Sequence, residues 1–137
     1  MTTHHAAVWL DHNEAHVFHI TAETYDEATI HSPKAHTRLH NKAGAAGTAG
    51  HRAVGDPHYY HEIAAALRGS GEILVLGPAT AKLELIRHIH KHDRELEPKI
   101  IGVETVDHPT DRQLVTYARR YFDAKDRAPV VPVAPVA

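Results

Sequence analysis

The stretch Glu72-Ile73-Leu74-Val75-Leu76-Gly77-Pro78 is the most informative part of this chain for its fold. Its apolar run has the length of a strand and is too short for a buried helix, and Gly77-Pro78 ends it. The residues that follow, roughly 79 to 92, have helical spacing. Four of them are expected on the buried stripe of that helix: Leu83, Ile86, Ile89 and His90. A buried strand that runs directly into a helix predicts an α/β protein.

Three strands are predicted before this stretch. Two β-prone runs cover Ala6–Asp11 and Glu14–Ile20. The residues between them include Asn13, a common turn residue, so the pattern indicates a β-hairpin. A third strand is expected over Glu27–His31, because Pro33 cannot donate to a sheet ladder.

Two further helices and one further strand complete the predicted fold. A first helix begins at Pro57, after Asp56 as its N-cap. A strand is expected over Ile100–Val106, and the last helix begins near Thr110, whose spacing to Gln113 fits a capping box. The inner face of that helix is expected to carry Leu114, Tyr117, Ala118 and Tyr121. The order βββαβαβα, with an antiparallel hairpin and helical crossovers, predicts a mixed five-stranded sheet with three helices.

The length and composition indicate one globular domain. The chain has 137 residues, of which 42% are hydrophobic and 23% charged, and we assign the domain to residues 1–125. Residues 126–137 are predicted to form a disordered tail, because Ala128–Ala137 has a proline at every third position. The absence of cysteine excludes disulfides, thiolate metal sites and cysteine nucleophiles. No apolar run is long enough for a signal peptide or a membrane span, so we expect a cytoplasmic protein without a membrane partner.

Residues 34–55 are predicted to form a long basic loop. The segment is rich in Gly, Ala and His, and no Asp or Glu occurs from Ala28 to Gly55. A loop of this length in a compact domain is uncommon unless it is functional or disordered. We expect it to contact RNA phosphates, with a tolerant surface insertion as the alternative. The candidate RNA-binding residues are Lys34, His36, Arg38, His40, Lys42 and Arg52, with Lys82 at the start of the second helix.

Three pieces of the chain, in order, resemble one protein family. They are the hairpin Ala7-Val8-Trp9-Leu10-Asp11 with Glu14-Ala15-His16-Val17-Phe18, the segment Pro33-Lys34-Ala35-His36-Thr37-Arg38, and Ile73-Leu74-Val75-Leu76-Gly77-Pro78 with Lys82 and Leu85. They are similar to the central domain of the archaeal and eukaryotic release factors, Pelota, and short bacterial relatives described as translational machinery proteins. The resemblance implies a ribonuclease H-like fold.

The chain departs from this family at one tripeptide. After Arg38 the family pattern has Gly-Gly-Gln, whereas this chain has Leu39-His40-Asn41. Side chains with a Cβ resist the backbone geometry that the two glycines permit, so the resemblance implies that peptidyl-tRNA hydrolysis is lost. What remains is a non-catalytic factor in translation or stress, with the ribosome or ribosomal or transfer RNA as partner and no cofactor. The sequence leaves the oligomeric state open.

The histidine content supports an alternative interpretation. The chain has 15 histidines. The pairs His88/His92 and His58/His61 have helical spacings that can present two imidazoles on one face. The favoured interpretation assigns no metal, and the alternative is a histidine-rich metal-binding or pH-responsive protein.

Carboxylates that suggest enzymatic chemistry are also present. Two-metal nuclease chemistry needs clustered carboxylates, to which Asp11 and Glu62 are candidates. The strand that ends in Gly77-Pro78 supplies no acid, which argues against a nuclease. Asp107-His108 with Asp111 suggests acid–base chemistry, but acids at the start of a helix favour a capping role. We therefore expect no catalytic residues.

Overall fold

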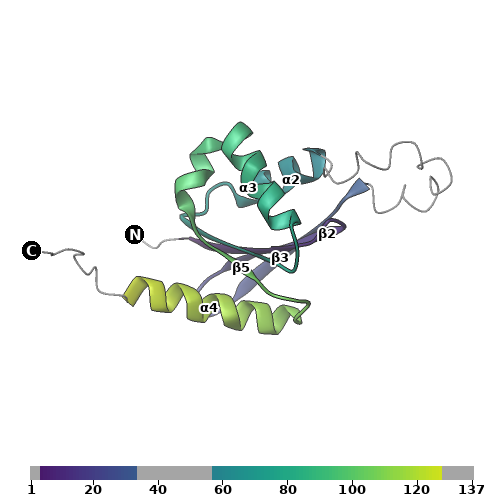
Figure 1. The fold of residues 1–137 in the computed structure, drawn as a ribbon. Coiled ribbons are helices and arrows are strands. Elements are labelled where there is room, and N and C mark those ends of the chain that lie inside the picture. The colour runs from purple at the N-terminus through teal and green to yellow at the C-terminus, as the bar shows by residue number, and fades with distance from the viewer. Residues whose placement is uncertain (1–3, 34–56, 128–137) are drawn as a thin grey trace, which may run out of the picture.

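The computed structural model describes residues 4–33 and 57–127 (Figure 1). The strands are β1 (His5–Leu10), β2 (Glu14–Ile20), β3 (Tyr25–His31), β4 (Glu72–Gly77) and β5 (Ile100–Thr105). The helices are α2 (Pro57–Leu67), α3 (Ala81–His92), the short 3-10 helix η2 (Arg94–Lys99) and α4 (Asp111–Arg127). Among the described residues the strands and α-helices follow the predicted order, and the 3-10 helix η2 lies in the polar connection before β5.

The strands form one mixed sheet in the order β3-β2-β1-β4-β5. β1 pairs antiparallel with β2, and β2 pairs antiparallel with β3. β1 pairs parallel with β4, and β4 with β5. The predicted α/β class and mixed five-stranded sheet are therefore confirmed. The ribonuclease H-like assignment stays a prediction.

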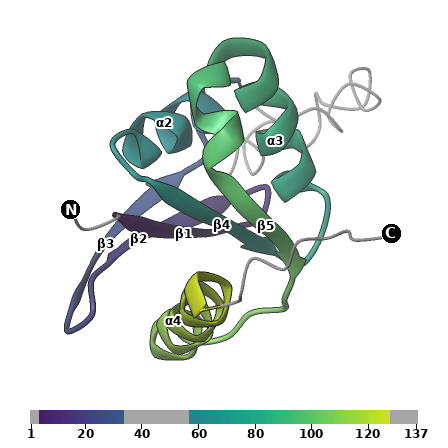
Figure 2. The same ribbon diagram turned by 90° about the vertical axis from the view of Figure 1, so that its left-hand side faces the viewer.

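Helices cover the sheet on both sides (Figure 2). α2 and α3 lie on one face and α4 lies on the other. Because successive strand residues point to opposite faces, each central strand serves two cores. In β1, Val8 packs under α2 and α3, whereas Trp9 packs towards α4. The near-continuous apolar sequence of β4 has the same cause, since a strand buried on both faces needs no polar alternation.

The end of β4 comes very close to β1. A Cβ on Gly77 would overlap the backbone carbonyl oxygen of Leu10. The parallel register of β1 and β4 pairs Trp9 with Leu76, so Leu10 and Gly77 lie opposite each other one residue further along. Only glycine allows this approach of two backbones.

Several sequence-based boundaries and faces are corrected. β3 begins at Tyr25 rather than Glu27. In α3, Leu83 is 45% exposed and His90 is exposed, so the expected stripe was wrong for these two residues. The buried residues of α3 are Ala81, Lys82, Leu85 and Ile89. The buried face of α3 is therefore rotated about the helix axis relative to the predicted face.

The inner face of α4 is also shifted. Leu114 and Ala118 are buried as predicted, whereas Tyr117 is 38% exposed and does not belong to the core. Val115 and Phe122 take its place in the core below β1 and β4. Tyr121 is partly buried and packs against the same core.

The C-terminal part of the domain extends slightly further than predicted. α4 continues to Arg127, two residues beyond the expected domain end at 125. The predicted basic loop at 34–55 and the tail at 128–137 lie outside the described residues. In the described part of the chain, no helix has the length and apolar character needed to cross a membrane.

Candidate functional site at the hairpin end of the sheet

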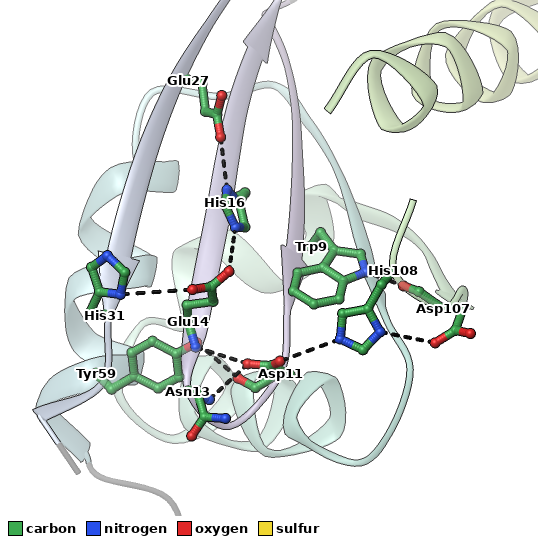
Figure 3. Close-up of polar contacts among 10 residues, drawn as sticks. All are labelled: Trp9, Asp11, Asn13, Glu14, His16, Glu27, His31, Tyr59, Asp107 and His108. Carbon is green, nitrogen blue, oxygen red and sulfur yellow. Dashed lines mark hydrogen bonds and ion pairs between the residues drawn. The ribbon is translucent and has the colours of Figure 1, made fainter. Parts of the chain in front are cut away.

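The described residues on either side of 34–56 attach to the same turn. This turn, Asp11–Glu14, joins β1 to β2. On one side, the amide of Ser32 donates to the carbonyl oxygen of Asn13 at 2.8 Å. On the other side, the Tyr59 hydroxyl donates to the backbone carbonyl oxygen of Asp11 at 2.9 Å. The hairpin turn therefore holds the described residues on both sides of the basic segment. Figure 3 shows the turn residues Asp11, Asn13 and Glu14 together with Tyr59.

Asp11 organises this turn. Its Oδ1 accepts the amide N–H of Asn13 at 2.8 Å and that of Glu14 at 2.9 Å. The Asp11 amide in turn donates to the Glu14 carbonyl at 3.0 Å. Aspartate side chains stabilise turns in this way by bonding to the backbone two or three residues on. One oxygen of the candidate carboxylate is thus already used by the fold.

The second oxygen of Asp11 faces a histidine from the β5–α4 connection. His108 Nε2 lies 3.7 Å from Asp11 Oδ2, and His108 Nδ1 lies 3.0 Å from Asp107 Oδ1. The hydrogen bond to Asp107 and the nearby charge of Asp11 raise the pKa of the exposed His108. The imidazole also packs on the indole of Trp9, with 4.9 Å between ring centroids.

Trp9 binds the β5–α4 connection to the sheet through a hydrogen bond. Its Nε1 donates to the backbone carbonyl oxygen of Asp107 at 2.7 Å. The indole is 4% exposed, and a buried indole N–H needs such an acceptor. The bond holds the segment before α4 against the carboxyl end of β1, which places His108 beside the hairpin turn.

A second histidine lies between two carboxylates on β2 and β3. His16 Nδ1 is 2.8 Å from Glu27 Oε2, and His16 Nε2 is 2.9 Å from Glu14 Oε2. Burial opposes the charge of His16, but the hydrogen bonds and charges of both glutamates raise its pKa overall. Glu14 also lies 3.9 Å from Nδ1 of His31 at the end of β3.

Together these side chains form the hairpin-end cluster, which we define as Asp11, Glu14, His16, Glu27, His31, Asp107 and His108. The cluster alternates imidazoles with carboxylates, so it can carry and exchange protons and can balance charge at the base of the basic segment. These contacts also hold two strands and the β5–α4 connection to one turn. Positioning is therefore the role that the geometry favours.

Potential metal ligands gather at two places among the described residues. Within residues 4–33 and 57–127, two groups of three potential metal ligands have their ligand atoms within 4.8 Å of one another. One group is His16, Glu27 and Asp111, and the other is His61, His88 and Asp93. Neither contains Asp11 or Glu62.

The start of α4 has the predicted cap. The Thr110 amide donates to Gln113 Oε1 at 2.9 Å, and the Gln113 amide donates to Thr110 Oγ1 at 3.2 Å. This reciprocal pair is a capping box. Asp111 follows in the first turn, where the helix dipole favours a negative charge.

Most of the predicted RNA-binding residues cannot be placed. Lys34, His36, Arg38, His40, Lys42 and Arg52 lie outside the described residues. Lys82 is described and is only 7% exposed, with its ammonium donating to the Ala79 carbonyl at 2.5 Å. An RNA contact by Lys82 stays a prediction, and it would require the side chain to leave this bond.

The structure brings together the rings of one predicted histidine pair, His88/His92, and separates the other pair by role, because only His61 belongs to a group of potential ligands. The rings of His88 and His92 lie near one another on α3, with centroids 4.8 Å apart. His61 on α2 approaches His88 across the helix pair, at 6.3 Å between centroids. His58 is exposed and belongs to neither group of potential ligands.

Asp93 is the functional candidate that sequence reasoning missed. It follows the last residue of α3 and is 2% exposed. The sequence did contain a signal, because Asp93 lies only five residues after His88 and could supply a ligand to the same site. Its meaning depends on the packing of α2 against α3, which no local pattern reveals. Burial, with the neighbouring His92 and His61, lowers the pKa of His88 against the opposing charge of Asp93.

Three solved structures share this architecture. Pelota of Thermoplasma acidophilum is 21% identical, with a TM-score of 0.63 over 90% of this chain. Pelota of Archaeoglobus fulgidus is 13% identical, with a TM-score of 0.64 over 91%. An archaeal translation termination factor, aRF1, is 13% identical, with a TM-score of 0.52 over 90%.

The chain corresponds to only part of these proteins. It spans 34%, 33% and 38% of their respective lengths. No protein-family model matches the chain, and no curated protein matches it in sequence. The similarity therefore establishes a fold, which this chain shares with about a third of each archaeal protein.

Proposed function

We propose that this protein is a non-catalytic, ribosome- or RNA-associated translation factor of the cytoplasm that acts in stress, and that it binds RNA through the basic segment 34–55. The observation that carries the proposal is the fold shared with archaeal Pelota and with a translation termination factor over about nine-tenths of this chain. The sequence resemblance to short bacterial relatives of that family supports the same assignment.

The charge of the segment supports RNA as the ligand. Residues 34–55 contain four Lys or Arg residues and no Asp or Glu, although the whole chain has a formal net charge of −2. Phosphate contacts need cationic side chains and not aromatic ones, and the segment has no aromatic residue. The histidines of the segment would add positive charge below their usual pKa of about 6.5.

The anchoring of the flanks supports a binding role for the segment. The hydrogen bonds of Ser32 and Tyr59, which flank the segment in the chain, hold these two residues at the turn Asp11–Glu14. Binding residues are commonly carried on loops that a rigid scaffold positions. The hairpin-end cluster provides such a scaffold at the base of this segment.

Co-sedimentation with ribosomes at low and moderate salt tests the proposal. The test variant replaces Lys34, Arg38, Lys42 and Arg52 with Ala. The matched control replaces four exposed basic residues elsewhere, Arg87, Lys91, Arg120 and Lys125, with Ala. Both variants lose the same charge, so any difference between them reports the position of the charges.

Wild type and the control variant are expected to sediment with ribosomes, with binding that weakens as salt rises because phosphate contacts release counterions. The test variant is expected to remain in the supernatant. Equal sedimentation of the test and control variants, or binding that is insensitive to salt, would refute the proposal. Nuclease treatment of the pellet distinguishes an RNA partner from a protein partner.

A further inference from the structure

A buried carboxylate and a buried imidazole meet between α2 and α3 without a hydrogen bond. His88 Nε2 lies 3.5 Å from Asp93 Oδ2, and their side chains are 10% and 3% exposed. In the part of the chain that the structure describes, neither of these two atoms has a hydrogen-bond partner. An unpaired buried polar atom destabilises the folded state, so such a pair needs an explanation.

The separation of the two atoms matches the geometry of a metal site. At 3.5 Å the pair is too long for a hydrogen bond. Two ligands of a tetrahedral zinc ion, bound at about 2.0–2.2 Å, lie about 3.3–3.6 Å apart. The nitrogen and the oxygen therefore have the spacing of two ligands on one ion.

A third ligand comes from α2. Potential ligand atoms of His61, His88 and Asp93 all lie within 4.8 Å of one another. The side chain of His61 is exposed, so its ring can turn towards His88 and Asp93 without displacing core residues. The ring of His92 also lies near that of His88, with 4.8 Å between centroids.

The surroundings orient the carboxylate towards this position. Arg68 donates to Oδ1 of Asp93 at 2.6 Å, which leaves Oδ2 facing His88. The backbone of Asp93 is also fixed, because its amide donates to the Ile89 carbonyl at the end of α3. Partners that orient a ligand in this way are a regular part of metal sites.

We propose that His61, His88 and Asp93 form a binding site for a divalent transition-metal ion, with zinc the ion that best fits two imidazoles and one carboxylate. The ion joins α2 to the carboxyl end of α3. Since α2 follows the basic segment directly in the chain, the site fixes the helix on which that segment ends. The proposal is independent of RNA binding.

Calorimetric titration of zinc chloride into the chelator-stripped full chain tests the site. The test variants are His61→Ala, His88→Gln and Asp93→Asn. The controls are His90→Ala, an exposed histidine on the same helix, and a variant with His36, His40 and His51 all replaced by Ala. Circular dichroism of each metal-free variant checks the fold, and His61→Ala remains informative because it changes an exposed side chain.

Wild type is expected to bind one zinc ion with micromolar or tighter affinity, and zinc is expected to raise its thermal unfolding midpoint. Each test variant should bind at least about tenfold more weakly, since even the loss of a supporting residue costs a metal site that much. Both controls should bind as wild type does. Absence of binding by wild type, full binding by His61→Ala, or loss of binding only in the His36/His40/His51 variant would overturn the proposal.

Discussion

The hydroxyl of Tyr59 donates a hydrogen bond to the backbone carbonyl oxygen of Asp11, 48 residues earlier in the chain. The bond joins the first turn of α2 to the hairpin turn, and the Tyr59 side chain is 1% exposed. Burial and the charge of Asp11 raise the pKa of Tyr59, so the phenol keeps its proton and stays a donor at any physiological pH.

Replacement of Tyr59 by Phe removes only this donor. We expect the free energy of unfolding to fall by about 1 kcal/mol, because the ring stays packed while one carbonyl loses its partner. Urea unfolding of both proteins measures the difference. Tyr117→Phe, at a residue that is 38% exposed, serves as the control and should change stability by less than about 0.5 kcal/mol. A Tyr59→Phe variant as stable as this control would contradict the role of the bond.

The ion pairs of His16 make stability depend on pH. The folded-state pKa of His16 is raised by Glu14 and Glu27 above the usual value of about 6.5. The stabilisation is therefore complete below pH ~6.5 and is lost as the pH rises through the folded-state pKa. His16→Gln should lose stability relative to wild type mainly at the acidic end of a series from pH 5.5 to about 8.5.

Comparison of the two proteins at each pH cancels the contribution of the other histidines. NMR titration of the His16 ring gives its pKa directly, and Glu27→Gln should lower that pKa. A difference in stability that stays constant across the pH series would count against this ion-pair arrangement.

Gly77 should tolerate no side chain. A Cβ at this position would overlap the Leu10 carbonyl, which the pairing of β1 with its neighbours holds in place. We expect Gly77→Ala to cost about 3 kcal/mol, at the upper end of overpacking effects, or to prevent folding. Thermal unfolding followed by circular dichroism measures this cost.

Gly102→Ala is a matched control for this prediction. A Cβ at Gly102 would meet the hydroxyl end of Tyr121, a partly buried side chain on α4 that can rotate away. The cost should be about 1 kcal/mol or less. If the two alanine variants were equally stable, the close approach of β1 and β4 would not be the reason for glycine at Gly77.

Hydrolysis of peptidyl-tRNA is expected to be absent. The resemblance to release factors implies that Leu39-His40-Asn41 replaces the tripeptide that positions water. Incubation of the protein with ribosomes that carry labelled peptidyl-tRNA should release no peptide above background. Peptide release that disappears in Asn41→Ala would contradict this prediction and show that Leu39-His40-Asn41 takes part in catalysis.

Local patterns predicted the parts of this fold that local chemistry determines. The apolar run of β4, the hairpin around Asn13 and the capping box of Thr110 with Gln113 all depend on residues a few positions apart, and all are present. Predictions failed where a helix face depends on its orientation against the sheet. Leu83 and Tyr117 fit the helical spacing, yet both are exposed rather than buried in the core.

The candidate sites depend even more on tertiary packing, which local sequence patterns do not predict. Asp11 was recognisable as a candidate carboxylate, but its proximity to His108 depends on Trp9 binding the backbone of Asp107 across 98 positions. Asp93 joins His61 only because α2 packs on α3. Contacts of this range are made by tertiary packing, and no spacing within one helix or strand encodes them.

The anchoring of Ser32 and Tyr59 to one hairpin turn has an evolutionary consequence. A segment whose two ends are held at neighbouring points can change in length or sequence without altering the register of the sheet, and longer loops cost little additional entropy. The strands and helices of the described residues can therefore remain constant while the inserted residues are exchanged. The same scaffold can therefore carry inserted sequences of different length and chemistry.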